Sequence, residues 1–88
     1  MIRRRLDIVN ERGLHARAAA KFVSLVGTFQ SAVTVSKDGI SVAGGSILGL
    51  MTLSASQGSA IDVAVEGPDE AVAADAIGAL VGSGFDEG

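Results

Sequence analysis

The chain of 88 residues contains no cysteine, no tryptophan, no tyrosine and a single histidine. Without cysteine it can form neither a disulfide nor a thiolate metal site, so nothing in it depends on an oxidising compartment. Its longest apolar run, residues 47–53, is far shorter than the roughly 20 residues that a membrane-spanning helix needs. We therefore expect a soluble, cytoplasmic protein with no membrane partner.

Basic residues are missing from the second half of the chain. Residues 1–44 carry all seven Lys and Arg with three acids, a net charge of +4, whereas residues 45–88 carry seven acids and no base, a net charge of −7. This split predicts a basic region for an anionic partner or group. Nucleic acid is a poor candidate, because the isoelectric point is about 4.8 and three phenylalanines are the only aromatic residues available for base stacking.

The length and the hydrophobic pattern predict a single α+β domain over residues 1–88. A chain of this size buries about 60 to 65% of the surface that its unfolded form exposes, which leaves no room for a second core. Strands are predicted where apolar residues alternate, and helices where they recur at spacings of three and four. The predicted order is strand 2–9, helix 15–26, strands 32–36 and 40–43, helix 47–53, strand 61–66 and a final helix opened by residues 67–70. Helices on one face of a mostly antiparallel sheet fit this order.

The single histidine, His15, stands where the first helix is predicted to begin, in the stretch ERGLHARAAAKF. A lone histidine at such a position is most simply a helix cap or a surface residue. A metal site is excluded, because it needs three or four convergent ligands. A hydrolytic triad is excluded as well, because the sequence near His15 has neither a G-x-S-x-G motif nor an adjacent acid.

One chemical role needs no second catalytic side chain. A neutral imidazole can itself attack a phosphoryl group, and the product is an anion. The amides around Ala16 and Arg17 can hold phosphate oxygens, because the first amides of a helix have no partner within it. The guanidinium of Arg17 suits phosphate, and Arg12 adds a second cation. The pattern therefore predicts a histidine that accepts phosphate.

Residues 13–17, Gly-Leu-His-Ala-Arg, resemble the active-site signature of HPr, the histidine phosphocarrier of the bacterial phosphoenolpyruvate-dependent phosphotransferase system. Residues 46–53 resemble the family's second signature, around its regulatory serine, and residues 66–70 resemble the start of its last helix. The resemblance extends over nearly the whole chain. It implies an open-faced β-sandwich, in which three helices cover one face of a four-stranded antiparallel sheet in the order β-α-β-β-α-β-α.

The same resemblance implies a function and a partner surface. His15 would accept phosphate on its Nδ1 atom from Enzyme I and pass it to an Enzyme IIA, so the chain would be a phosphoryl carrier rather than a free-standing enzyme. No cofactor is implied, and a transient carrier is expected to be a monomer. The implied docking surface lies on the first two helices and comprises Leu14, Ala16, Arg17, Ala20, Lys21, Ser24, Ile47, Leu48, Gly49, Met51 and Thr52. For Leu48 and Met51, packing in the core is an equally good interpretation.

The sequence departs from the family's pattern at two positions. Ala18 stands where the family often has proline, and its presence should loosen the first helical turn by about 1 kcal/mol or less. Arg12 stands where sugar-transport members commonly have a small polar residue. Arg12 and the tail at residues 82–87 resemble the nitrogen-related branch, NPr. A regulatory phosphorelay is thus favoured, and a sugar-transport HPr is the alternative.

Ser46 has two interpretations. Its hydroxyl can cap the second helix, a role worth about 1 kcal/mol. The resemblance adds phosphorylation by an ATP-dependent HPr kinase, which would place about two negative charges on the docking face. A non-transferring adaptor controlled through Ser46 is therefore an alternative function. A small-molecule-binding module is a third possibility, although a core made mainly of alanine and valine argues against a defined pocket.

Overall fold

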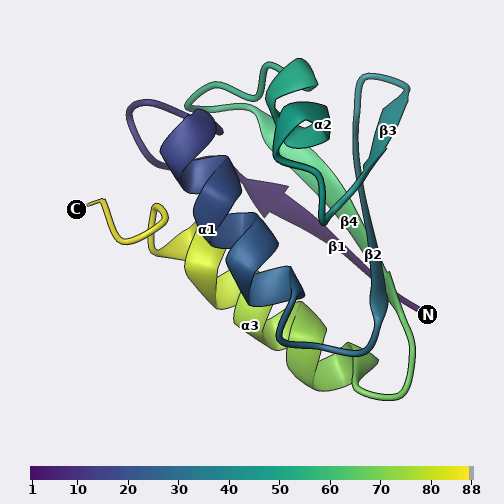
Figure 1. The fold of residues 1–88 in the computed structure, drawn as a ribbon. Helices are drawn as coiled ribbons and strands as arrows, with labels where there is room; N and C mark the ends of the chain where they lie inside the picture. Colours follow the sequence, from purple (N-terminus) through teal and green to yellow (C-terminus); the bar gives the residue numbers. More distant parts are fainter. Residues whose placement is uncertain (88) are drawn as a thin grey trace.

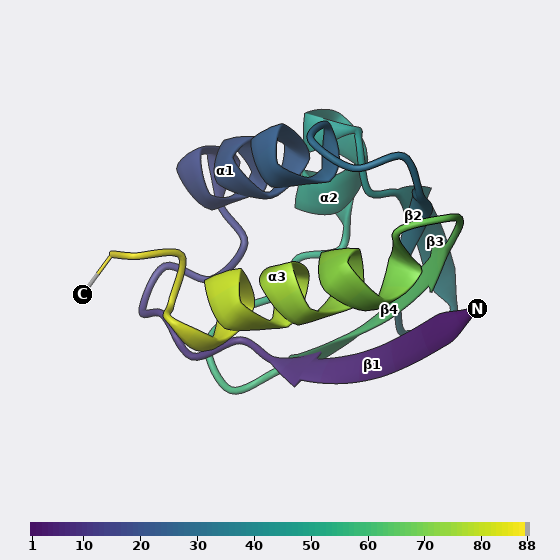
Figure 2. The ribbon, with the colours of Figure 1, turned by 90° about the horizontal axis from the view of Figure 1, so that it is seen from below.

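A computed structural model describes residues 1–87 of the chain. Three helices cover one face of a single four-stranded antiparallel sheet, in the element order expected from the sequence (Figure 1). The strands are β1 (Ile2–Asp7), β2 (Ala32–Lys37), β3 (Ile40–Ala43) and β4 (Ala60–Glu66), and the helices are α1 (Ala16–Val26), α2 (Ile47–Thr52) and α3 (Glu70–Gly82). Figure 2 shows all three helices on the same side of the sheet, so the predicted open-faced β-sandwich is confirmed.

The sheet has the strand order β1-β4-β2-β3. In the central strand β4, Val63 pairs with Arg4 of β1 on one side and with Val35 of β2 on the other. Alternate residues of a strand face opposite sides, so β4 buries its valines and its isoleucine against the helices and leaves its acids on the open face. The Asp38-Gly39 turn joins β2 to β3, with φ of 51° and 83°, the pair of positive angles that this type of hairpin requires.

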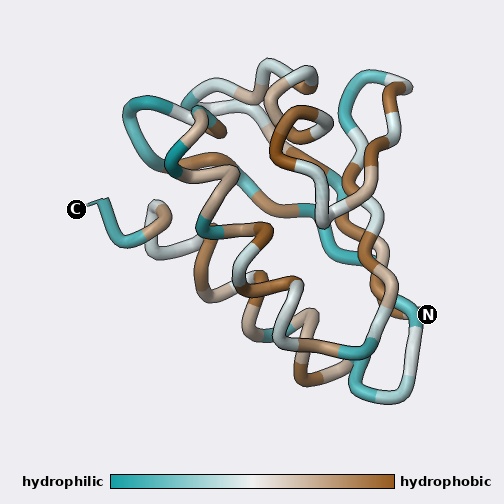
Figure 3. Tube along the Cα trace, in the orientation of Figure 1, coloured by the Kyte–Doolittle hydropathy of each residue, from teal (hydrophilic) through white to brown (hydrophobic). Residues whose placement is uncertain are grey.

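The core lies between the sheet and the helices and draws side chains from every layer. Phe22 of α1, Leu50 of α2 and Ile77 of α3 are fully buried against β-strand residues such as Val35 and Ile61. Figure 3 shows the matching pattern along the chain, with hydrophobic stretches recurring in the strands and helices and a hydrophilic loop before α1. The core fixes α1 above the sheet and thereby fixes the position of the helix start.

One strand and one helix are shorter than predicted. β1 ends at Asp7 and not at residue 9, because Ile8 exchanges its backbone hydrogen bonds with the loop before β4, donating to Ser59 and accepting from Gly58, both at 2.8 Å. α2 ends at Thr52, and Leu53 closes it as the C-cap. Between residues 1 and 87, no helix is long and apolar enough to span a membrane.

The connection between β4 and α3 is tied to the start of β2. The Asp69 carboxylate accepts hydrogen bonds from the Gln30 amide at 2.9 Å and from the Ser31 hydroxyl at 2.5 Å. Both hydrogen bonds lower the pKa of Asp69, and the bond from Ser31 has the larger effect. Gly67 lies close by at φ +154°, where a Cβ atom would come within 2.6 Å of the Ser31 Cα atom. This junction holds the start of α3 in place.

Candidate functional site

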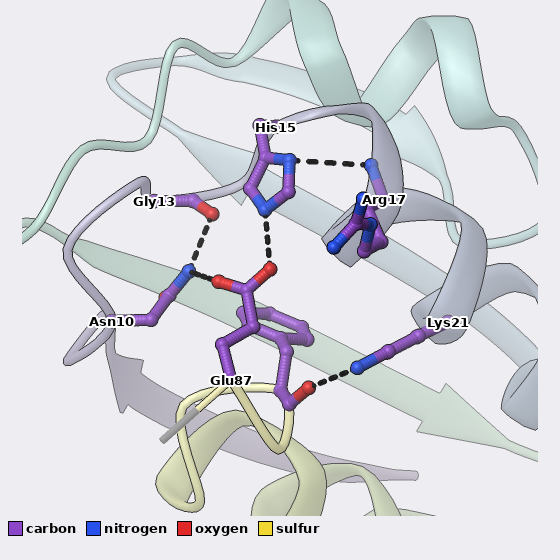
Figure 4. Close-up of polar contacts among 7 residues, drawn as sticks. Asn10, Gly13, His15, Arg17, Lys21 and Glu87 are labelled. Carbon is purple, nitrogen blue, oxygen red and sulfur yellow. Dashed lines mark hydrogen bonds and ion pairs between the residues drawn. The ribbon is translucent and has the colours of Figure 1, made fainter.

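His15 is the N-cap of α1, as its position in the sequence predicted. Its backbone is extended, with φ −79° and ψ −178°, and its carbonyl accepts the first intrahelical bond, from Ala19, at 2.8 Å. Its ring bends back over the helix start, so that Nδ1 accepts a hydrogen bond from the Arg17 amide at 3.3 Å (Figure 4). An imidazole has thus taken the capping role that Ser, Thr, Asp or Asn usually fills.

The loop before His15 is held by its backbone. Gly13 has φ +66°, and a Cβ atom there would lie 2.4 Å from the Ala55 carbonyl oxygen. Leu14 donates its amide to that same oxygen at 2.8 Å, and its side chain is only 5% exposed. Leu14 was predicted to lie on the docking surface, but its side chain packs in the core instead. It anchors the loop that presents His15.

The other nitrogen of the ring faces a carboxylate. Nε2 of His15 lies 2.5 Å from Oε2 of Glu87, a residue 72 positions away in the sequence (Figure 4). Both side chains are largely covered, with 23% and 19% of their area exposed. No acid is adjacent to His15 in the sequence, so this partner was missed. The expectation that His15 has no neighbouring carboxylate is wrong, because the fold brings one from the opposite end of the chain.

The two contacts define the protonation of a neutral His15 ring. An ionised carboxylate can only accept a hydrogen bond, so the proton of the ring lies on Nε2, towards Glu87. A backbone amide can only donate, so Nδ1 presents its lone pair to Arg17. Both neighbours favour the same tautomer. The atom with the available electron pair is therefore Nδ1, at the N-terminus of α1.

The segment that carries Glu87 is fixed at several points. We call residues 84–87 the tail segment. Its Phe85 is completely buried, and the Phe85 carbonyl accepts a hydrogen bond from the Lys21 ammonium group at 2.6 Å. The Asn10 side-chain amide donates to Glu87 Oε1 at 2.9 Å and to the Gly13 carbonyl at 2.8 Å. Asn10 thus links the tail segment to the loop before His15.

These contacts keep Glu87 ionised. The hydrogen bond from Asn10, followed by that from His15, holds the pKa of Glu87 below its usual value. A carboxylate that is already the acceptor of two donors favours its charged form. At neutral pH the His15 ring therefore faces a negative charge on the Nε2 side.

Basic and acidic side chains both gather between the start of α1 and the tail segment. An open depression of about 840 Å³ there is lined by the bases Arg12, Arg17 and Lys21 and by the acids Glu11, Asp86 and Glu87. Neither arginine takes part in an ion pair with another of residues 1–87. Guanidinium groups suit phosphate oxygens, so both remain candidates for holding an anion on Nδ1. Within the same residues, no group of three His, Cys, Asp or Glu is arranged to hold a metal ion.

Apart from buried Leu14, the residues predicted for docking fall into exposed and half-buried groups. Helices α1 and α2 lie side by side (Figures 1 and 2), and His15 caps the start of α1. Of the four large apolar side chains of α2, Leu50 is buried and the other three are exposed: Ile47 by 38%, Leu48 by 77% and Met51 by 41%. Core packing is thereby excluded for Leu48 and Met51. The exposed members also include Ala16, Arg17, Ser24 and Thr52, whereas the half-buried ones are Ala20, Lys21 and Gly49.

Ser46 is the N-cap of α2, as predicted. Its hydroxyl accepts a hydrogen bond from the Gly49 amide at 3.0 Å, and its backbone is extended, with φ −114°. Ser46 is half-buried at the start of a helix that exposes Ile47, Leu48 and Met51. A change of charge at Ser46 therefore acts directly on the surface formed by α2.

Comparisons with a family model, with individual proteins and with solved structures all give the same family. Residues 2–83 match the family described as "PTS HPr component phosphorylation site". The chain is 46% identical over its whole length to the phosphocarrier protein HPr of Cupriavidus necator, of which 99% is covered. It is 47% identical over 85 residues to the phosphocarrier protein NPr of Proteus mirabilis, with 96% of this chain and 94% of that protein covered.

Solved structures agree with the sequence relatives. A crystal structure of HPr from Thermoanaerobacter tengcongensis superposes with a TM-score of 0.95 at 41% identity, covering 100% of this chain and 99% of that one. The sheet order, the helix-capping histidine and the sequence relatives all describe one kind of molecule. The chain belongs to the HPr family, the phosphocarrier proteins of the phosphotransferase system.

Proposed function

We propose that this phosphocarrier accepts a phosphoryl group on Nδ1 of His15 from phospho-Enzyme I and passes it to an Enzyme IIA of a regulatory, nitrogen-type phosphotransferase system. The observation that carries the proposal is the ring geometry. Nδ1 presents a lone pair at the N-terminus of α1, while Nε2 is occupied by Glu87. No other histidine exists in the chain.

The helix start is suited to the anion that transfer creates. The N–H···N bond from Arg17 to Nδ1 is long at 3.3 Å and is given up when Nδ1 bonds to phosphorus. The Arg17 amide is then free to donate to a phosphate oxygen, and the partial positive charge of the helix N-terminus favours the anion. Exposed Ala16 offers a neighbouring amide without a side chain in the way. The guanidinium groups of Arg17 and Arg12 add charge from the side.

The partners are expected to dock on α1 and α2 around His15. Leu48 and Met51 expose apolar area beside the site, while Arg17 supplies charge. An apolar centre with a charged rim suits a transient contact, and unpaired arginines favour an acidic partner surface. Both Enzyme I and Enzyme IIA have to reach the same histidine, so they are expected to use this surface in turn. A carrier of this kind works as a monomer in the cytoplasm.

The nitrogen-type assignment is supported by the resemblance of Arg12 and of residues 82–87 to the nitrogen-related branch. In this structure Arg12 lines the depression near the start of α1, and Glu87 of the tail segment contacts His15. Relatives of both names are similarly close, at 46% identity for an HPr and 47% for an NPr. A sugar-transport role is the second candidate. The identity of the faster Enzyme I separates the two.

The test is the mass of the intact protein after incubation with phosphoenolpyruvate, magnesium and Enzyme I, using the enzymes of the sugar and the nitrogen branches separately. The wild type is expected to gain one acid-labile phosphate, faster from the nitrogen-type donor, and His15→Ala to gain none. Faster transfer from the sugar-type donor would move the protein to the sugar branch. A folded wild type that accepts phosphate from neither donor would refute the carrier role and favour an adaptor regulated through Ser46.

A further inference from the structure

We infer that Glu87 is a positioning residue for phosphoryl transfer, which holds His15 as the Nε2–H tautomer and compensates the positive charge that the ring acquires when Nδ1 bonds to phosphorus. The inference rests on the proposed function and extends it to a residue outside the histidine's own loop. It starts from one contact, between Nε2 of His15 and Oε2 of Glu87 at 2.5 Å.

The carboxylate is placed firmly enough to orient a ring. Phe85 is buried completely and ties the tail segment to the core, and Lys21 holds the Phe85 carbonyl. Asn10 holds the second oxygen of Glu87 at 2.9 Å. Each carboxylate oxygen therefore has its own donor, one from Asn10 and one from His15. A side chain held by such a network loses little further freedom when it orients its partner.

The backbone of the tail segment is specialised for this placement. Phe85 and Asp86 have φ of 56° and 58°, a region that residues other than glycine rarely occupy. Two successive residues in this conformation reverse the chain after α3 and bring Glu87 back over the start of α1. Such a conformation persists only where the surrounding contacts determine it, and here these are the burial of Phe85 and the hydrogen bond from Lys21.

The contact with Glu87 does not involve the reacting atom. Glu87 lies at Nε2, whereas Nδ1 faces the Arg17 amide at the N-terminus of α1 (Figure 4). The carboxylate and the incoming phosphate therefore occupy opposite nitrogens of the ring. A carboxylate beside Nδ1 would repel the phosphate, but on the Nε2 side it stabilises a charged ring.

The transfer step balances without a further reactant. The lone pair of Nδ1 forms the new N–P bond, and the bond from phosphorus to the donor breaks with its electron pair returning to the donor. The His15 ring keeps its proton on Nε2 and becomes a cation, which pairs with the Glu87 carboxylate. When the phosphoryl group leaves for the acceptor, the N–P electron pair returns to Nδ1 and restores the neutral Nε2–H tautomer.

The test combines a spectroscopic signature of His15 with transfer rates, in the wild type, Glu87→Gln and Asp86→Asn. Asp86→Asn is the matched control, because Asp86 is an exposed acid of the same segment and asparagine also tolerates positive φ. In protein with ¹⁵N-labelled histidine at alkaline pH, long-range ¹H–¹⁵N spectra report the tautomer. A proton held between Nε2 and a carboxylate is also expected to resonate at low field.

The wild type and Asp86→Asn should show the Nε2–H tautomer with its low-field proton. Glu87→Gln should lose that proton signal and transfer phosphate on the order of tenfold more slowly. Tenfold is the lower end of the loss in metal affinity or activity seen when a metal-binding histidine loses the partner that orients it. A wild type with the proton on Nδ1 would overturn the inference. The inference would also be overturned if Glu87→Gln kept the low-field signal, or if it lost the signal but transferred phosphate at the wild-type rate.

The two proposals can fail separately. If no variant accepts phosphate from any donor while the low-field proton depends on Glu87, the carrier function is refuted and the tautomeric control of His15 stands. If phosphate is accepted equally by all three proteins, the carrier function stands and the role of Glu87 is refuted.

Discussion

Substitution of Ser46 separates a structural role from a functional one, because the two respond differently to alanine and to aspartate. The Ser46 hydroxyl accepts the Gly49 amide at 3.0 Å and thereby satisfies one free donor of α2. Ser46→Ala removes that acceptor, which typically costs about 1 kcal/mol. In a domain of this size, such a loss lowers the melting temperature by about 4 to 8 °C. Ser46→Asp keeps an acceptor at the helix start and should leave the melting temperature near that of the wild type.

Phosphoryl transfer should be slowed by Ser46→Asp and not by Ser46→Ala, the reverse of the effect on the melting temperature. Ser46→Ala adds no charge to α2 and is expected to transfer phosphate at the wild-type rate. Ser46→Asp places a negative charge next to the exposed Ile47 and Leu48, where we propose that an acidic partner docks. Two like charges about 4 Å apart in water repel by about 1 kcal/mol, which is about fivefold in rate. Because salt shortens the screening length to about 3 Å at 1 M, this deficit should largely disappear there.

The assay measures thermal unfolding and single-turnover transfer from phospho-Enzyme I for the three proteins at low and high salt. Ser46→Ala with an unchanged melting temperature would refute the capping argument. Ser46→Asp that transfers at the wild-type rate would refute the electrostatic one. A transfer deficit of Ser46→Asp that persists unchanged at high salt would mean that the substitution distorts α2 and does not act through charge.

Three further predictions concern docking, the tail segment and pH. Leu48→Ser should slow transfer several-fold with stability within about 0.5 kcal/mol of the wild type. Val72→Ser, at an apolar site of α3 that is 64% exposed against 77% for Leu48, should leave both unchanged, and equal transfer by the two variants would contradict the docking surface. Phe85→Ala should lower the free energy of unfolding in urea by about 3 kcal/mol or more, and a loss below about 1 kcal/mol would show that Phe85 does not anchor the tail segment. The lowered pKa of Asp69 means that its contribution to stability is present above its unfolded-state pKa of about 4 and is lost as the pH falls through the lower folded-state pKa. Asp69→Asn should therefore be less stable at neutral pH and lose less stability on acidification, and parallel pH–stability curves would count against this role.

Most of the fold followed from the sequence, because its elements are specified by local pattern. The alternation of β4 and the Asp-Gly turn predicted a buried sheet face and a hairpin, and both are present. The two capping residues, His15 and Ser46, were also predictable, because a helix start is a local event. Helix α1 follows its cap directly and stops before Gly27 as expected.

The part of the site that escaped prediction depends on contacts between distant segments. Glu87 meets His15 only because α3 packs beside α1 and because Phe85 and Asp86 adopt positive φ, a conformation that their residue types do not favour. The only sequence signal was an acidic pair after an aromatic residue in a polar tail. Leu14 was misplaced for a similar reason, because its loop bonds to Ala55, a residue distant in the sequence, and its side chain packs in the core.

The central claim is that phosphate is carried on Nδ1 of His15, and the most direct measurement is the identification of the phosphorylated nitrogen. Protein with ¹⁵N-labelled histidine, phosphorylated by Enzyme I and phosphoenolpyruvate, would be examined by ³¹P and long-range ¹H–¹⁵N NMR. The geometry predicts coupling of phosphorus to Nδ1, with Nε2 still protonated and facing Glu87. Phosphorus on Nε2, or on any residue other than His15, would contradict the account.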